Sequence, residues 1–197
     1  MRASTRREFV RGPAGRIECA VDEPEGARRG SALIAHPHPL YGGTLDNKVV
    51  QTLARAFIEL GYETWRPNFR GVGASEGDHD EGRGELEDLH AIVNQLQSAK
   101  LVLAGFSFGA ALQAQLSKTL EVERLVLVGV AVTRLQVPEV ARDSLVIHGE
   151  NDETVPLAAV LDWARPQDLP VVLVPGADHF FHRKLQVLRT IVQSNWR

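Results

Sequence analysis

Cysteine is almost absent from this chain, since Cys19 is the only one in its 197 residues. A single thiol cannot form a disulfide within the chain, so no intrachain disulfide is possible. The absence of such bonds is compatible with a reducing compartment. We therefore expect a cytoplasmic protein.

Long apolar runs are missing as well. Residues 1–7 are basic but lead into no apolar segment of signal-peptide length, and no stretch approaches the length of a membrane span. Charge of one sign is not in excess either, because the formal net charge is only −3. This gives no electrostatic reason to expect nucleic acid. We expect neither a signal peptide, nor a membrane partner, nor a nucleic-acid partner.

Repeats and low-complexity segments are also lacking. Hydrophobic residues make up 44% of the chain and charged residues 24%, both ordinary for a globular protein. The length lies within the usual range of one domain. We predict a single domain over residues 1–197.

What is present is an alternation of short apolar runs and helical patterns. Residues 8–11 and 16–21, joined by Gly-Pro-Ala-Gly, predict an antiparallel hairpin at the edge of a sheet. Further strands are predicted near residues 31–36, 62–67, 101–106, 124–130, 144–148 and 171–175. The helical spacing between these runs predicts helices on both faces of the sheet. Gly61 predicts the end of the first of these helices. The fold class is α/β, with a mainly parallel sheet of right-handed connections.

Residues 105–109 read Gly-Phe-Ser-Phe-Gly and carry the most informative motif of the chain. An apolar run precedes this G-x-S-x-G pattern, and an alanine-rich stretch follows it. Strand, tight turn and helix are the context in which the central Ser107 becomes an exposed nucleophile. A Cβ at position 105 or 109 would collide with the neighbouring helix or strand, and glycine avoids this.

A serine hydroxyl needs a base to take its proton, and the base needs an acid to orient it. Downstream, Asp152 and then His179 each follow a predicted strand. This is the chain order, serine then acid then histidine, that accompanies a G-x-S-x-G motif between a strand and a helix. We assign Asp152 as the acid and His179 as the base, with Glu150 as the reserve acid. Asp178 is too close in sequence to His179 to orient it. The alternative interpretation makes Asp152 a turn or helix cap before Pro156 and His179 an ordinary surface histidine.

The loop after the strand at residues 31–36 reads His-Pro-His-Pro-Leu-Tyr-Gly-Gly. Two backbone N–H groups form the oxyanion hole on this scaffold, one directly after the nucleophile, at Phe108, and one in this loop. Proline has no N–H, which leaves His38 or Leu40, and we favour His38. Leu40 and Tyr41 of the same loop are predicted to contact substrate. Reading His36 and His38 as metal ligands is the competing interpretation, but no cysteine or carboxylate cluster joins them, and we predict no metal.

Five segments resemble the α/β-hydrolase superfamily, and in particular its small bacterial members that lack a lid and carry an H-P-H-P-L-Y-G-G loop. They read HPHPLYGGTLDNK, RPNFRGVGASEG, GFSFG, HGENDETVP and GADHFF, and the resemblance runs from about residue 31 to 181. It implies a serine hydrolase with a catalytic triad. The size and layout also resemble the dienelactone hydrolases. Those carry a cysteine at the nucleophile position, where this chain has Ser107, which argues against a dienelactone substrate.

Two further loops allow predictions about access to the site and about Arg70. The interval between residue 132 and the strand at residue 144 leaves no room for the cap domain that many relatives insert there, so we predict an open site. The glycine-rich loop at residues 68–77 lacks the lysine of a phosphate-binding loop, and we interpret its Arg70 as a structural residue that hydrogen-bonds nearby loop carbonyls.

The predicted function is hydrolysis of a small carboxylic ester or thioester through an acyl-enzyme, without a cofactor. The alternatives are a small peptidase or amidase, which would use the same residues, and a catalytically idle scaffold used for binding. The expected partner is the small-molecule substrate, and the expected state is a monomer or a homodimer.

Overall fold

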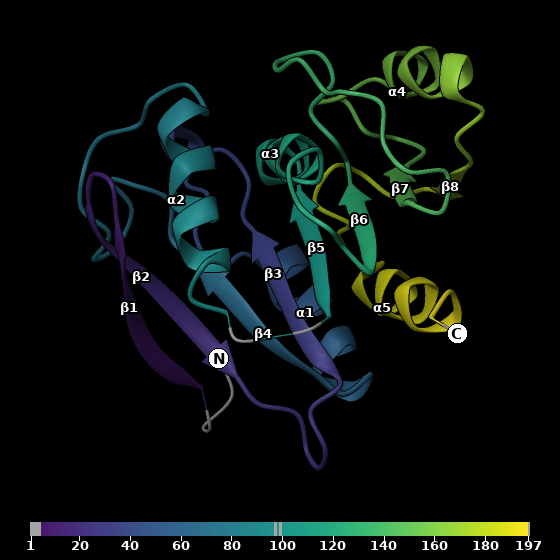
Figure 1. The fold of residues 1–197 in the computed structure, drawn as a ribbon. Helices are drawn as coiled ribbons and strands as arrows, with labels where there is room; N and C mark the ends of the chain where they lie inside the picture. Colours follow the sequence, from purple (N-terminus) through teal and green to yellow (C-terminus); the bar gives the residue numbers. More distant parts are fainter. Residues whose placement is uncertain (1–4, 97, 99, 197) are drawn as a thin grey trace.

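A computed structural model describes residues 5–96, 98 and 100–196 of the chain (Figure 1). Residues 1–4 lie outside the described residues. They begin the basic segment, residues 1–7, for which no signal peptide is predicted. Three other positions of the predicted domain, 97, 99 and 197, also lie outside the described residues.

The described residues form an eight-stranded sheet with the order β1-β2-β4-β3-β5-β6-β7-β8. The strands are β1 (Arg6–Gly12), β2 (Gly15–Asp22), β3 (Gly30–Ala35), β4 (Tyr62–Pro67), β5 (Leu101–Phe106), β6 (Arg124–Val128), β7 (Leu145–Gly149) and β8 (Val171–Val174). From β4 to β8 every neighbouring pair is parallel. The predicted α/β class with a mainly parallel sheet is confirmed.

The N-terminal hairpin lies at one edge of the sheet, as predicted. β1 pairs antiparallel with β2, in a register that sets Val10 opposite Ile17, and β2 pairs antiparallel with β4. Both strands are longer than the sequence predicted, because pairing continues to Gly12 and Gly15 on either side of a two-residue turn. Gly15 has a φ of +129°, which a side chain would strain.

Helices cover both faces of the sheet, as predicted. α2 (Arg83–Val93), α3 (Phe108–Leu116) and α4 (Leu157–Ala164) pack over one face, and α1 (Lys48–Glu59) and α5 (Leu185–Ser194) over the other. In Figure 1, α2 and α3 lie in front of the sheet and α1 lies behind it. Alternate residues of the central strands supply the two cores, since Leu103 faces one and Ala104 the other.

The ends of α1 show why the chain folds locally as it does. The Asn47 side chain accepts hydrogen bonds from the N–H groups of Val49 and Val50 and caps the first turn. An apolar stripe that includes Leu53 and Phe57 is buried against the sheet. Gly61, with a φ of +90°, stops the helix where the sequence predicted.

The strand order places a crevice at the middle of the sheet. β3 pairs with β4 on one side and with β5 on the other, so the direction of sheet growth reverses between β3 and β5. Open α/β sheets bind ligands outside the carboxyl ends of the strands at such a reversal. The Ser107 turn follows β5, and the loop at residues 36–43 follows β3.

The segment between β6 and β7 is an open loop. β6 ends at Val128, earlier than the predicted residue 130, because Gly129 adopts a φ of +52° and turns the chain away from the sheet. No helix or strand forms between residues 129 and 144, all of which the structure describes. The site is therefore bounded by loops rather than by a cap. Within the described ranges, no helix is long and apolar enough to cross a membrane.

Candidate active site

Ser107 occupies a sharp turn between β5 and α3. Its φ of 56° and ψ of −114° lie in a region that a residue with a side chain rarely adopts. Hydrogen bonds hold the turn on both sides, since the Ser107 N–H donates to Val128 O and the Ser107 carbonyl accepts from Ala111 N. The surrounding structure thus fixes a conformation that the residue would not choose by itself.

The two glycines of the motif permit this turn. A Cβ on Gly105 would lie 2.5 Å from the backbone of Gly109, at the start of α3. A Cβ on Gly109 would lie 2.4 Å from His36 O and 2.5 Å from Ala35 O, at the end of β3. The predicted steric role of both glycines is confirmed: they let the helix sit directly against the strand ends.

The structure brings Ser107, His179 and Asp152 together from three strand ends. His179 Nε2 lies 3.1 Å from Ser107 Oγ, and His179 Nδ1 lies 2.7 Å from Asp152 Oδ2. All three side chains are buried. A carboxylate only accepts, so Nδ1 carries the proton and Nε2 presents its lone pair to the serine hydroxyl. This arrangement can take the serine proton as the oxygen attacks.

Asp152 uses its two oxygens differently. Oδ1 accepts from the N–H groups of Thr154, at 2.9 Å, and Val155, at 2.8 Å, while Oδ2 accepts from His179. The turn-capping interpretation and the orienting interpretation are therefore both satisfied by one carboxylate. Burial acts to raise the pKa of Asp152, but the hydrogen bonds from His179 and Val155 outweigh it and lower that pKa. The carboxyl is ionised at neutral pH.

The other two carboxylates considered do not reach the imidazole of His179. Glu150 is exposed, and its Oε2 accepts from Gly176 N at 2.7 Å. Asp178 binds the ring of His182 instead, at 2.6 Å. The reserve assignment of Glu150 is not supported by the geometry.

Two N–H groups are free to bind an oxyanion beside Ser107. Phe108 is the first residue of α3, where a backbone N–H has no partner within the helix. In the loop after β3, Leu40 N donates to His38 Nδ1 at 3.2 Å and is thereby occupied. Within the described residues, no acceptor engages the N–H of His38 or of Phe108. The geometry thus separates the two candidates that the sequence left open, and His38 is the one with a free donor.

A cavity of about 500 Å³ opens over Ser107. Leu40 and Tyr41 line it, as do the ring of Phe108 and residues from the loops after β6 and β7. Leu40 is 67% exposed and Tyr41 is 77% exposed, so both present apolar surface at the rim. Their predicted contact with substrate fits this position and stays a prediction.

Comparisons with known proteins identify the family of this chain. Residues 38–142 match the family described as the alpha/beta hydrolase fold. A Xanthomonas campestris structure, described as an α/β serine hydrolase without a lid, is 37% identical with a TM-score of 0.90, over 99% of this chain and 94% of that one. This chain belongs to the α/β-hydrolase family. It is a lidless serine hydrolase of that family.

Two further relatives are similar to this chain over most of its length. A Coxiella burnetii structure, described as an α/β serine hydrolase homologue, is 37% identical with a TM-score of 0.88 and covers 100% of both chains. An uncharacterised protein of Rickettsia prowazekii is 32% identical over an alignment of 198 positions, which covers 90% of this chain and 83% of the relative.

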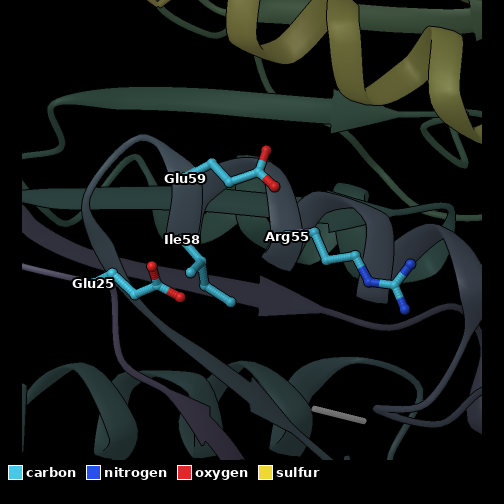
Figure 2. Close-up of a pocket in the computed structure, with 4 residues that line it drawn as sticks. All are labelled: Glu25, Arg55, Ile58 and Glu59. Atoms are coloured by element: carbon cyan, nitrogen blue, oxygen red, sulfur yellow. The ribbon is translucent and has the colours of Figure 1, made fainter. Parts of the chain in front are cut away.

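A second hollow of about 470 Å³ lies elsewhere on this α/β hydrolase (Figure 2). Figure 2 shows Arg55, Ile58 and Glu59 on α1, with Glu25 from the loop before β3 beside them. The Glu59 carboxylate is already bound by Arg189. Side chains of both charge signs line this hollow. Ser107 and His179 are not among its lining residues, so the hollow is separate from the candidate active site.

His36 has no free ring nitrogen with which to bind a metal, as the competing interpretation would require. Its Nδ1 donates to Pro37 O at 2.6 Å and its Nε2 accepts from Phe69 N at 3.0 Å, so both ring nitrogens are occupied. Burial lowers the pKa of His36 to about 4, which keeps the ring neutral. The described residues contain no group of three or more potential metal-ligating side chains. The role of His36 in this hydrolase is to tie the β3 loop to the loop after β4.

Two polar side chains near the site differ from what the sequence predicted. Arg70 is buried, which supports a structural role. Its guanidinium binds the Asp88 carboxylate at 2.8 and 2.9 Å and Gly84 O, and both partners lie on α2 rather than in a loop, so the predicted bonds to loop carbonyls are wrong. His148, a fully buried histidine on β7 near Asp152, was not predicted to belong to the site. The signal available was a polar residue inside an apolar strand, four positions before the acid.

Proposed function

We propose that the chain hydrolyses a small carboxylic ester or thioester through an acyl-enzyme intermediate. The observation that carries the proposal is the pair of hydrogen bonds that His179 makes, at 3.1 Å to Ser107 Oγ and at 2.7 Å to Asp152 Oδ2. Ser107 also lines a cavity of about 500 Å³. The reaction needs only groups of this chain, so the proposal includes no cofactor.

In the first half-reaction, Ser107 Oγ forms a bond to the substrate carbonyl carbon while His179 Nε2 takes its proton. Asp152 stabilises the imidazolium that results, because its charge lies against Nδ1–H. The carbonyl electron pair moves onto oxygen, where the N–H groups of Phe108 and His38 hold it. α3 adds to this stabilisation, since the positive end of its dipole lies at Phe108. The tetrahedral intermediate then expels the alcohol or thiol, which leaves with the proton from His179.

The second half-reaction repeats these steps with water. His179 takes a proton from a water molecule as it attacks the acyl-enzyme, and the collapse of the intermediate returns the proton to Ser107 Oγ. The acid product leaves through the open side of the site. Since no cap excludes solvent, water reaches the acyl-enzyme without a conformational change.

The two alternatives differ in testable ways. A peptidase or amidase would use the same residues but must protonate a poorer leaving group. A scaffold used only for binding would not need the hydrogen bonds that join Ser107, His179 and Asp152. Their presence argues against an idle scaffold. We further propose a cytoplasmic location, and a monomer or homodimer as the working state.

The proposal is tested by labelling and by a substrate panel. A fluorophosphonate probe reacts only with an activated serine, so it should label the wild-type chain and not S107A. The panel would contain p-nitrophenyl esters, acyl-CoA thioesters and the matching p-nitroanilides of graded acyl length. Faster turnover of the anilides would favour the amidase alternative. Absence of both labelling and turnover would overturn the proposed function.

A further inference from the structure

His148 lies on β7, four residues before Asp152, and its side chain is fully buried. Its Nε2 is 3.0 Å from Val155 O and 3.8 Å from Asp152 Oδ2. Its Nδ1 has no hydrogen-bond partner among the described residues. The His148 imidazole thus lies next to the Asp152 carboxylate, which binds His179.

The protonation of His148 follows from its partner. A backbone carbonyl only accepts, so the contact with Val155 O requires a proton on Nε2. Burial lowers the pKa of His148, more than the nearby Asp152 charge raises it, so the ring is neutral with the proton on Nε2. At 3.8 Å, Asp152 Oδ2 is too far for a hydrogen bond. His148 therefore acts on Asp152 mainly through Val155.

Val155 connects the histidine to the carboxylate. Its N–H donates to Asp152 Oδ1 at 2.8 Å, and its carbonyl accepts from His148 at 3.0 Å. The peptide group that follows involves Pro156, which has no N–H to offer. His148 is the donor that fixes residue 155 from the carbonyl side, and residue 155 in turn fixes Asp152.

Stability alone does not account for a histidine here. An unpartnered, fully buried ring nitrogen is a desolvated acceptor and weakens the folded state. An apolar side chain of similar size would remove this unpartnered acceptor but leave Val155 O without its donor, so it would change the stability little. The donor that the histidine supplies binds Val155, whose N–H in turn binds Asp152.

We propose that His148 is a positioning residue, which keeps the Asp152 carboxylate oriented toward His179 by holding the 152–155 turn through Val155. This inference rests on the proposed function, since it gives His148 a part in the same proton transfer. Misorientation of a catalytic group by about 1 Å costs roughly 10²-fold in rate. Two N–H bonds to Oδ1 remain without His148, so we expect a smaller loss, about tenfold in kcat.

The experiment compares two substitutions of matched size. His148→Gln keeps an amide N–H that reaches toward Val155 O, whereas His148→Met fills the volume with no donor. For each chain, kcat is expressed per active serine, counted by fluorophosphonate titration, alongside KM and the melting temperature. Normalising to active serine removes the contribution of misfolded protein.

The expected result is a split between the variants. H148M loses about tenfold in kcat per active serine, with KM within about twofold, and melts within about 3 °C of the wild type. H148Q keeps at least about a third of the wild-type kcat. A merely structural histidine would lower the melting temperature and leave kcat per active serine unchanged.

Three outcomes overturn the inference. One is wild-type kcat per active serine in H148M. Another is an equal loss in H148Q and H148M, which would show that the donor is irrelevant. If H148M does not fold, folded H148Q decides alone, and a drop in its kcat beyond threefold contradicts the proposal. Failure of the proposed function is distinguishable, because the wild-type chain itself would then neither label nor turn over an ester.

Discussion

At residue 107 the backbone is held at a φ of 56° and a ψ of −114°, which costs a residue with a side chain about 1–3 kcal/mol. Removing the hydroxyl with alanine keeps that strain, whereas glycine adopts these angles freely. We predict that both S107A and S107G lower kcat by at least ~10³-fold. We also predict that S107G has the larger free energy of unfolding, by about 1 kcal/mol.

Urea unfolding of the two variants measures the strain, and steady-state kinetics measures the nucleophile. Both variants lack the same oxygen, so their difference in stability reports the backbone alone. Equal stability would show that the turn stores no strain. Activity retained in either clean variant would remove Ser107 from the mechanism.

Asp152 and Glu150 provide a matched pair of acids two positions apart. D152N keeps the shape but loses the charge that stabilises the imidazolium, so kcat should fall by about 10³-fold. E150Q should leave kcat within about twofold, because Glu150 is exposed and bonds Gly176 N rather than His179. Kinetics of both variants on one p-nitrophenyl ester checks this. A larger loss in E150Q would mean that the two roles are exchanged.

His36 makes stability depend on pH in a defined direction. Burial lowers its pKa from 6.5 to about 4, so the unfolded chain binds this proton more readily than the folded one. Its contribution is therefore complete above pH 6.5 and is lost as the pH falls towards 4. The loss amounts to about 3 kcal/mol, at about 1.4 kcal/mol per pH unit. Protonation of Nε2 would also break the bond from Phe69 N.

Urea unfolding of the wild type and of H36Q across this pH range is the measurement. H36Q has no titratable group at this position, so its free energy of unfolding should fall less steeply between neutral and acid pH. His148 is also buried with a lowered pKa and contributes in the same direction in both chains. Parallel curves for the two proteins would contradict the role assigned to His36.

At the scale of elements, the contact between α3 and the end of β3 positions the nucleophile. In G109A the new Cβ would lie 2.4 Å from His36 O, and neither backbone can yield without moving Ser107. We predict a destabilisation above about 2 kcal/mol and a lower kcat. Gly176 is the control, because it has a φ of +64° but nothing within 4 Å of a Cβ, so G176A should cost only about 1 kcal/mol. Equal effects on stability would show that contact with β3 is unimportant.

The elements themselves followed from local patterns. Apolar runs predicted the positions of the strands, and Gly61 marked the end of α1, because burial and backbone freedom act over a few residues. The errors lie at boundaries. β6 ends at Val128 rather than residue 130, and the hairpin extends to Gly12 and Gly15, since pairing with a neighbouring strand decides where a strand stops.

At the scale of the whole molecule, the open loop between β6 and β7 governs substrate size. No cap supplies apolar wall beyond the cavity of about 500 Å³. Each buried methylene is worth roughly 0.8 kcal/mol, or about fourfold in kcat/KM, but only while the wall continues. We predict that kcat/KM for p-nitrophenyl esters peaks at about two to six acyl carbons and then declines.

A series of p-nitrophenyl esters measures this preference. We also expect no jump in activity when the substrate passes its solubility limit, since there is no lid to open at an interface. A clear preference for acyl chains of about twelve carbons or more would contradict the prediction. It would require an apolar tunnel, formed by the Leu40 and Tyr41 loop or by a second subunit.

The sequence by itself determined the α/β class and the three residues of the proposed triad, because both depend on order along the chain. Ser107, Asp152 and His179 each follow an apolar run, and parallel strands bring their carboxyl ends to one edge. The contacts that favour Asp152 over Glu150 and His38 over Leu40 exist only in the tertiary structure. Those choices depend on hydrogen bonds across strands and loops, which neighbours in sequence do not specify. The same reason hid His148, whose contact with Asp152 exists only once β7 and the turn after it are folded.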